Sequence, residues 1–142
     1  MGFSLSASAA IIGISILVAA EITIGTFFPA INDIYSSYDD MRNRAIEQIQ
    51  SDIKITKISA ITNNSNYDLN ITVNNTGSTT LDTTNFNVLI NGTNQVFYKS
   101  KRYLYPETHV YLKLYSLPGT GNKRLKVITN NGISDYQKYT VS

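Results

Sequence analysis

Residues 86–98 read Phe-Asn-Val-Leu-Ile-Asn-Gly-Thr-Asn-Gln-Val-Phe-Tyr, which places two short apolar runs on either side of an Asn-Gly pair. An Asn-Gly pair between such runs is a strong hairpin signal, because both turn positions need a positive φ that these residues adopt readily. The runs themselves, 86–90 and 95–98, are rich in residues that favour strands. This stretch therefore predicts a β-hairpin that turns at Asn91-Gly92.

The same pattern extends along most of the remaining chain. Leu125, Val127 and Thr129 precede a second pair, Asn131-Gly132, and a further run follows at 133–136. Ile53, Ile55, Ile58 and Ile61 begin a further strand, and apolar and polar residues alternate in the stretches 69–73 and 110–115, as they do in half-buried strands. About six or seven short strands, with a turn roughly every ten residues, predict an immunoglobulin-like antiparallel β-sandwich over residues 53–142.

The N-terminal segment has a different character, because residues 3–20 contain no charged side chain. Eighteen helical residues span roughly 27 Å, close to the ~30 Å hydrocarbon core of a bilayer. We predict a single transmembrane helix over residues 1–28. A cleaved signal peptide is the rival interpretation, but it normally begins with positive charge, and only Met1-Gly2 precedes the run. Glu21 lies either at the outer interface or, as a functional carboxylate, at bilayer depth.

Residues 29–52 are predicted to form an amphipathic helical stalk after Pro29, which is expected to kink or restart the helix. Apolar residues recur there at spacings of three and four. They are Ile31, Ile34, Tyr35, Tyr38, Met41, Ala45, Ile46 and Ile49. This stripe packs either on the chain's own β-domain or on other helices, by self-association or by insertion into a helical bundle, and the adjoining membrane segment favours association.

The charge is divided between the two halves of the chain. Residues 1–52 hold six acidic and two basic residues, a net charge of −4, whereas residues 53–142 hold ten basic and four acidic residues, a net charge of +6. Four Asn-x-Ser/Thr sequons are candidate N-glycosylation sites, and together with the acidic stalk they favour an extracytoplasmic β-domain. They begin at Asn63, Asn70, Asn74 and Asn91.

No arrangement of residues indicates catalysis. Cysteine is absent, which excludes disulfides, thiolate metal sites and cysteine nucleophiles, and His109 is the only histidine. We therefore expect no enzymatic activity, no metal and no cofactor.

A basic and aromatic stretch is the candidate contact with a protein or glycan partner. The alternative is that this stretch is an ordinary solvated loop. Its residues are Lys99, Lys101, Arg102, Tyr103 and Tyr105. Nucleic acid is not expected as a partner outside the membrane.

Several stretches of the chain together resemble the archaellum accessory protein F family, whose sister family, accessory protein G, has the same layout. They are Met1-Gly-Phe-Ser-Leu-Ser-Ala7, Gln50-Ser-Asp-Ile53, Leu69-Asn-Ile-Thr-Val-Asn-Asn-Thr-Gly-Ser-Thr-Thr-Leu81 and Leu125-Lys-Val-Ile-Thr-Asn-Asn-Gly-Ile-Ser-Asp135. In the third stretch, Gly77 is expected to turn the chain and Leu81 to return it to the core.

This resemblance implies a stator of the archaeal swimming motor, anchored in the lipid of the cytoplasmic membrane. Its immunoglobulin-like domain would lie beneath the S-layer and bind S-layer protein, as a dimer and together with accessory protein G. The alternative is a pilin-like or archaellin-like filament subunit. Such subunits carry a basic residue and Gly before a peptidase cut and a Glu soon after it. Here no basic residue precedes Gly2 and the carboxylate comes only at Glu21, which favours the tether.

Overall fold

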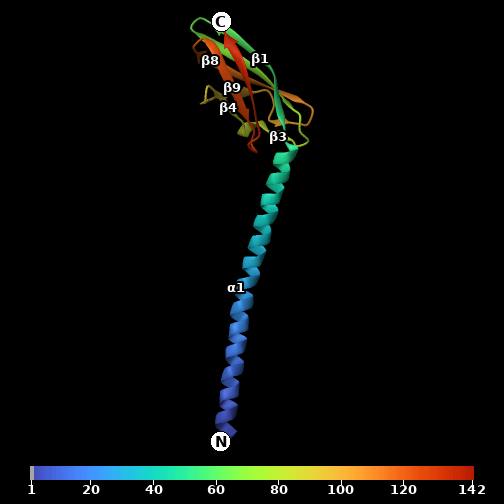
Figure 1. Ribbon diagram of the computed structural model, residues 1–142, viewed down its shortest axis with the longest axis vertical. Coiled ribbons are helices and arrows are strands. Elements are labelled where there is room, and N and C mark those ends of the chain that lie inside the picture. The colour runs from blue at the N-terminus through green and yellow to red at the C-terminus, as the bar shows by residue number, and fades with distance from the viewer. Residues whose placement is uncertain (1) are drawn as a thin grey trace. The chain divides into compact units, whose positions relative to one another are not determined.

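The computed structural model describes residues 2–142; Met1, the first residue of the predicted membrane segment, lies outside them. One long helix is followed by ten strands and a single 3-10 turn (Figure 1). The elements are α1 Gly2–Gln50, β1 Ile53–Asn63, β2 Asn66–Asn75, β3 Leu81–Asp82, η1 Thr83–Asn85, β4 Asn87–Ile90, β5 Thr93–Gln95, β6 Tyr98–Lys99, β7 Tyr103–Leu104, β8 His109–Pro118, β9 Gly121–Ile128 and β10 Ser134–Val141.

Helix α1 contains a segment that is long and apolar enough to cross a membrane. Its serine and threonine side chains bond to the backbone one turn earlier: the Thr23 hydroxyl donates to the Ala19 carbonyl at 2.7 Å. Such local bonds satisfy polar groups where lipid offers no partner. The helix continues through Pro29, so the expected restart there is wrong. Proline removes one backbone donor, and the intact bonds on either side hold the helix together.

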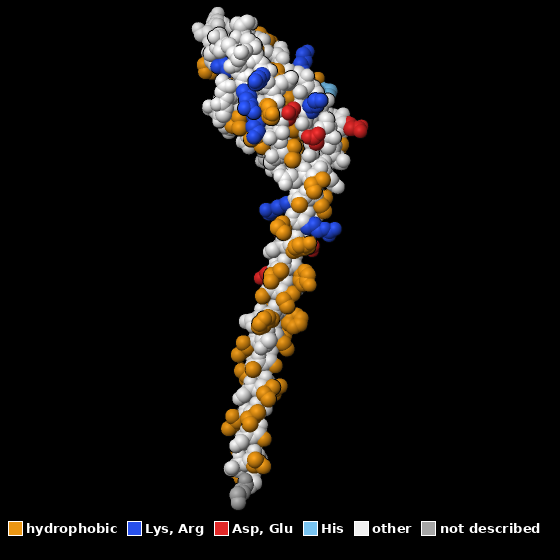
Figure 2. Space-filling model, in the orientation of Figure 1, with side chains coloured by type: hydrophobic (Ala, Val, Ile, Leu, Met, Phe, Trp, Pro, Cys, Tyr) orange, Lys and Arg blue, Asp and Glu red, His pale blue; other side chains and the backbone are white. Residues whose placement is uncertain are grey.

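The chain divides into two compact units, whose described residues are 2–43 and 44–142. The first unit is helical only, and its apolar side chains are exposed along the helix (Figure 2). The second unit contains the last turns of α1 and all ten strands. Within this second unit Ile46 and Ile49 are 38% and 84% exposed, so this end of the predicted apolar stripe is not buried against the sandwich.

The strands form two four-stranded antiparallel sheets, ordered β1-β2-β8-β6 and β10-β9-β4-β5, with a small β3-β7 pair beside them. Their inward-facing residues build one core. Its fully buried members include Leu69, Ile71 and Leu112 from one sheet and Val88 and Leu125 from the other. The edge strands β1 and β10 of the two sheets are also in contact, because the Ile55 amide of β1 donates to Asp135 Oδ2 of β10 at 2.8 Å. The predicted immunoglobulin-like sandwich behind an N-terminal helix is confirmed.

The first predicted hairpin is confirmed, and the second differs. Asn91 and Gly92 have φ of 49° and 87° and join β4 to β5 as a two-residue turn. The second turn spans residues 129–133, of which only Gly132 has a positive φ. Thr129 explains the longer turn, because its hydroxyl is 3.0 Å from the Ile133 carbonyl and closes a five-residue loop.

The predicted strand 95–98 is also wrong, because the chain changes sheets there. Gln95 ends β5 beside β4, whereas Tyr98 begins β6 beside β8 in the opposite sheet. Val96 and Phe97 make the crossing, which lets a short apolar run contribute to both layers. Five of the strands have eight residues or more, so the strands are longer and more numerous than the sequence predicts.

Candidate functional site

The C-terminal end of α1 is held by the turn that follows β2. The Ser78 amide donates to the Gln50 carbonyl at 2.7 Å, and the Thr76 and Gly77 amides donate to the Asp52 carbonyl at 3.0 and 3.1 Å. The Thr76 hydroxyl also donates to Asp52 Oδ2 at 2.7 Å. The last carbonyls of a helix normally lack partners, and this turn supplies one to the carbonyl of Gln50. We call residues 75–78 the helix socket.

Gly77 is required in the socket because of close packing. A Cβ added there would lie 2.5 Å from the Gln50 carbonyl oxygen and still closer to the Asp52 nitrogen, both of them backbone atoms. The chain bends at residues 77–79, as expected, but the φ of Gly77 is not among the positive glycine values of the described residues, so glycine is not needed there for its backbone conformation. Glycine here lets two backbones touch. Leu81 is fully buried, as expected of a residue that returns to the core.

The buried Asn75 side chain fixes the conformation of the socket through hydrogen bonds. It is 1% exposed, and its amide nitrogen donates to the carbonyls of Thr79 at 2.7 Å and Leu104 at 3.1 Å. Its oxygen accepts the Gly77 amide at 3.0 Å. A buried amide with three partners restricts the turn to one conformation, because leaving any of these groups unpaired would cost free energy.

A second loop, residues 129–133 between β9 and β10, contacts another side of the helix end. The Asn131 side-chain nitrogen donates to the Ser51 hydroxyl and lies 3.5 Å from the Glu47 carbonyl. Gln48 Nε2 returns a bond of 3.4 Å to the Asn131 carbonyl. Helix end and sandwich are thus joined by hydrogen bonds to two loops, and only Ser51 and Asp52 separate α1 from β1.

The predicted contact residues lie in one segment around β6 and β7, and two of them already have partners. Lys99 Nζ donates to the Thr84 hydroxyl at 2.7 Å, and Arg102 pairs with Asp82 at 3.5 Å. The Thr84 amide, and to a lesser extent Arg102, holds the pKa of Asp82 below its usual range. The other three residues are Lys101, Tyr103 and Tyr105, all exposed.

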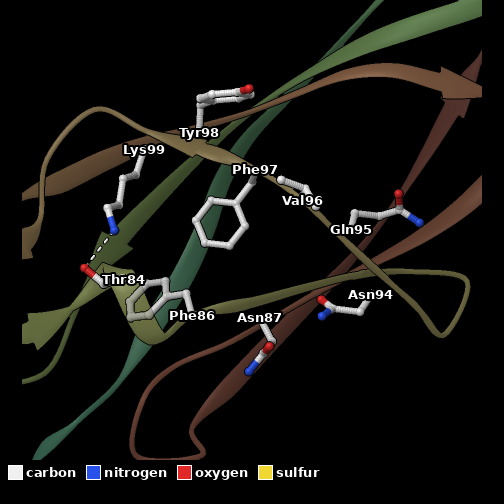
Figure 3. A pocket seen from close by; sticks show the side chains of 9 residues that line it. All are labelled: Thr84, Phe86, Asn87, Asn94, Gln95, Val96, Phe97, Tyr98 and Lys99. Carbon is white, nitrogen blue, oxygen red and sulfur yellow. Dashed lines mark hydrogen bonds between the residues drawn. The ribbon is translucent and has the colours of Figure 1, made fainter.

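Beside this segment is a hollow of about 380 Å³ at the point where the chain crosses between sheets (Figure 3). The side chains of Phe86 and Phe97 line it, together with Val96 and Tyr98, and Lys99 bonds to Thr84 at its rim. Sequence reasoning missed this hollow, because it predicted one continuous strand through Val96.

The four sequons lie in two kinds of place. Asn63 is exposed at the end of β1, and Asn91 is exposed in the turn between β4 and β5. Asn91 Oδ1 accepts the Arg124 amide at 2.8 Å. Asn70 lies half-buried in the middle of β2 and Asn74 half-buried near its end, both between β1 and β8. Glycosylation at any of the four stays a prediction.

His109, the only histidine, lies on the surface beside Tyr111. The Tyr111 hydroxyl is 2.9 Å from His109 Nε2, and the two rings meet edge to face. No nucleophile or carboxylate bonds to this ring within residues 2–142, and that same range contains no group of three residues able to hold a metal ion. The best-defined arrangement of polar groups in the β-domain is therefore the helix socket, which binds the chain's own backbone.

Comparison with known proteins identifies the family. No curated protein matches the chain. Among solved structures, the chain is similar to the archaellum periplasmic stator protein FlaG from Sulfolobus acidocaldarius, with a TM-score of 0.54 and 22% sequence identity over 63% of this chain and 99% of that one. This likeness supports the shared fold. The model of the archaeal-type flagellin family matches residues 2–142, and the chain therefore belongs to that family.

Proposed function

We propose that this protein is a membrane-anchored stator component of the archaellum motor, in which the β-domain tethers the motor to the S-layer. The helix socket carries the proposal. A stator must resist torque, and a flexible linker between anchor and head would absorb the load. Here only Ser51 and Asp52 separate helix from sandwich, and backbone hydrogen bonds from residues 76–78 hold Gln50, the last helical residue, and Asp52.

Three further observations support this role. Helix α1 has a segment that suits a bilayer, as an anchor in membrane lipid requires. The fold is similar to that of a protein described as a periplasmic stator. The net charge of +6 in residues 53–142 and the sequons suit a head outside the cytoplasmic membrane. The proposed role is structural, with S-layer protein and accessory protein G as partners and a homodimer as the working form.

The second candidate function is a filament subunit, which the family match over residues 2–142 favours. Both functions need an apolar N-terminal helix, but they differ in what surrounds it. A filament subunit packs its helix on many identical copies, whereas a stator keeps it in lipid and is needed only in small numbers at each motor.

Fractionation of cells that carry a tagged chain separates the two functions. For a stator we expect the chain in carbonate-washed membranes, absent from sheared filaments, and capturing S-layer protein after mild solubilisation. Deletion should leave filaments assembled but stationary. Recovery of the chain as a main component of sheared filaments, or its release by carbonate, would overturn the stator proposal.

A further inference from the structure

Three tyrosines are exposed together on the outer face of the β1-β2-β8-β6 sheet. Tyr111 and Tyr115 lie on β8 and Tyr98 on β6, with exposed fractions of 47%, 53% and 65%. The alternation of β8 explains their exposure, because Leu112 and Leu114 point into the core and are fully buried. The rings of Tyr98 and Tyr115 meet edge to face with centroids 5.5 Å apart, so they form a small aromatic platform.

Polar side chains cross this face in rows set by the strand register. Ser59 of β1 pairs with Asn70 of β2, which pairs with Lys113 of β8, which in turn pairs with Tyr98 of β6. The adjacent row contains Lys57, Thr72 and Tyr111. Amide, hydroxyl and ammonium groups therefore lie on β1, β2 and β8, and the aromatic rings lie beside them on β8 and β6. We call the residues of these two rows, with Tyr115, the tyrosine face.

The tyrosine face is hollowed along its length. One hollow, of about 390 Å³, is lined by Lys57, Ser59, Asn70, Thr72, Tyr111 and Lys113. A second, of about 310 Å³, is lined by Tyr98, Lys99, Ser100, Tyr111 and Lys113. Because Tyr111 and Lys113 belong to both hollows, the two form one shallow strip from β1 to β6. A strip of this form suits an extended ligand better than a compact one.

The charge of the strip is positive. Lys57, Lys99 and Lys113 line it, and none of its lining residues is acidic. The one ion pair of the described residues, Arg102 with Asp82, lies elsewhere. The nearby carboxylate of Asp68 already accepts the Ser116 amide at 2.9 Å. Lys57 and Lys113 therefore remain available to an anionic ligand, whereas the Lys99 ammonium already bonds to the Thr84 hydroxyl.

We propose that the tyrosine face binds an acidic polysaccharide. The C–H groups of a sugar ring carry slight positive charge and pack on the negative face of an aromatic ring. Asn70, Ser59 and Thr72 can bond to sugar hydroxyls, and the lysines pair with carboxylate or sulfate groups. Protein–protein interfaces are depleted of lysine, whereas lysines line both hollows of this face. The proposal depends on this face alone and holds for either candidate function.

Binding of the full chain in neutral-lipid nanodiscs to three polymers tests the proposal: polygalacturonate, dextran sulfate and uncharged dextran. We expect binding to at least one acidic polymer and little to dextran, and the two acidic polymers separate carboxylate from sulfate recognition. Tyr111→Ala and Lys113→Gln should each weaken binding about tenfold, a typical loss for an aromatic or charged anchor.

Matched controls lie on the outer face of the opposite sheet. Tyr136 is 59% exposed on β10 and pairs with Lys126 of β9. Tyr136→Ala and Lys126→Gln should leave binding within about twofold. Tyr98→Ala, in the two-residue edge strand β6, gives a tyrosine-face variant that does not depend on the long strand β8 folding normally.

Three outcomes would overturn the proposal. These are the absence of binding to both acidic polymers, equal binding to dextran, and equal losses for the tyrosine-face variants and their controls, which would mean attraction to net positive charge alone. Thermal unfolding of every variant identifies losses that come from misfolding, and binding by a folded Tyr98→Ala variant as tight as that of the parent chain would also count against the proposal.

Discussion

Helix α1 and the β-domain are both rich in apolar residues, but these residues are exposed on the helix and largely buried in the β-domain. No described side chain of α1 is buried, and Leu17, for example, is 70% exposed. Leu69, in the middle of β2, is completely buried. The difference shows that the sandwich stabilises itself by its own packing, whereas the apolar surface of the helix needs lipid or another helix to cover it.

The contact between the last turns of α1 and the strands, all within residues 44–142, consists of hydrogen bonds rather than apolar packing. At the junction, Ser51 and Asn75 are buried polar residues, and backbone donors from residues 76–78 meet the carbonyls of residues 50 and 52. Hydrogen bonds are directional, so this contact fixes the orientation of the last helical turns on the sandwich more narrowly than apolar packing would. We therefore expect substitutions to reduce stability most in the core, less in the socket and least in the surface loops.

The largest expected effect is that of a core truncation. Leu69→Ala should lower the free energy of unfolding of the β-domain by about 2–5 kcal/mol, because it removes buried contacts and leaves a cavity. The matched variant Leu17→Ala in the helix should leave that free energy unchanged. Urea unfolding of the nanodisc-embedded chain, followed by tyrosine fluorescence, measures both. Similar losses in the two variants would contradict the division between a self-packed sandwich and an externally covered helix.

The socket should show a smaller effect. Gly77→Ala places a methyl group against two backbones, so the turn must move and weaken its bonds to Gln50 and Asp52. We expect a loss of about 2 kcal/mol, corresponding to one or two hydrogen bonds. Faster amide hydrogen exchange should appear at Ser78 and in the last helical turn. Gly92→Ala, which strains a turn remote from the helix, should cost about 1–2 kcal/mol and leave this exchange unchanged.

Swimming of cells that carry Gly77→Ala or Gly92→Ala tests whether the socket matters for the proposed function. A stator with a loosened socket should still localise to the membrane but transmit less torque. Cells that carry Gly92→Ala should swim normally at a temperature where both variants are folded. Normal swimming of a folded Gly77→Ala variant would show that rigid coupling at the socket is not needed.

Much of this architecture could be predicted from local sequence patterns. The alternation of Val110, Leu112 and Leu114 reports burial directly, and Asn91-Gly92 encodes its own turn. The apolar run at 3–20 likewise predicts its helix without reference to the rest of the chain. These signals are local because each depends on residues a few positions apart.

The features that escaped prediction depend on contacts between distant segments. Gly77 is needed because Gln50 passes against it, and no pattern around residue 77 contains that information. Val96 lies between two strands only because β4 and β8 belong to different sheets. The basic segment was predicted as a contact surface from composition, which does not show that Asp82 and Thr84 already bind two of its cations.

The smallest expected effect belongs to the exposed cap at Asp82. Its carboxylate accepts the Thr84 amide at 2.9 Å and pairs with Arg102, which together lower its pKa from the ordinary value of 3.8. A depressed pKa in the folded state means that the ionised group stabilises the fold. That contribution is fully present above the pKa of the unfolded chain and is lost as the pH falls through the pKa of the folded chain.

Asp82→Asn should therefore lower the melting temperature slightly at neutral pH, and the difference from the parent chain should shrink as the pH falls below about 4. Arg102→Gln should produce a smaller change, because the Thr84 amide is the main cause of the shift. Melting curves from pH 2 to 7 measure both. A difference that persists unchanged at pH 2 would mean that the cap acts through shape rather than charge. Because Asp82 lies outside both the core and the socket, this loss should leave amide exchange at Ser78 unaltered.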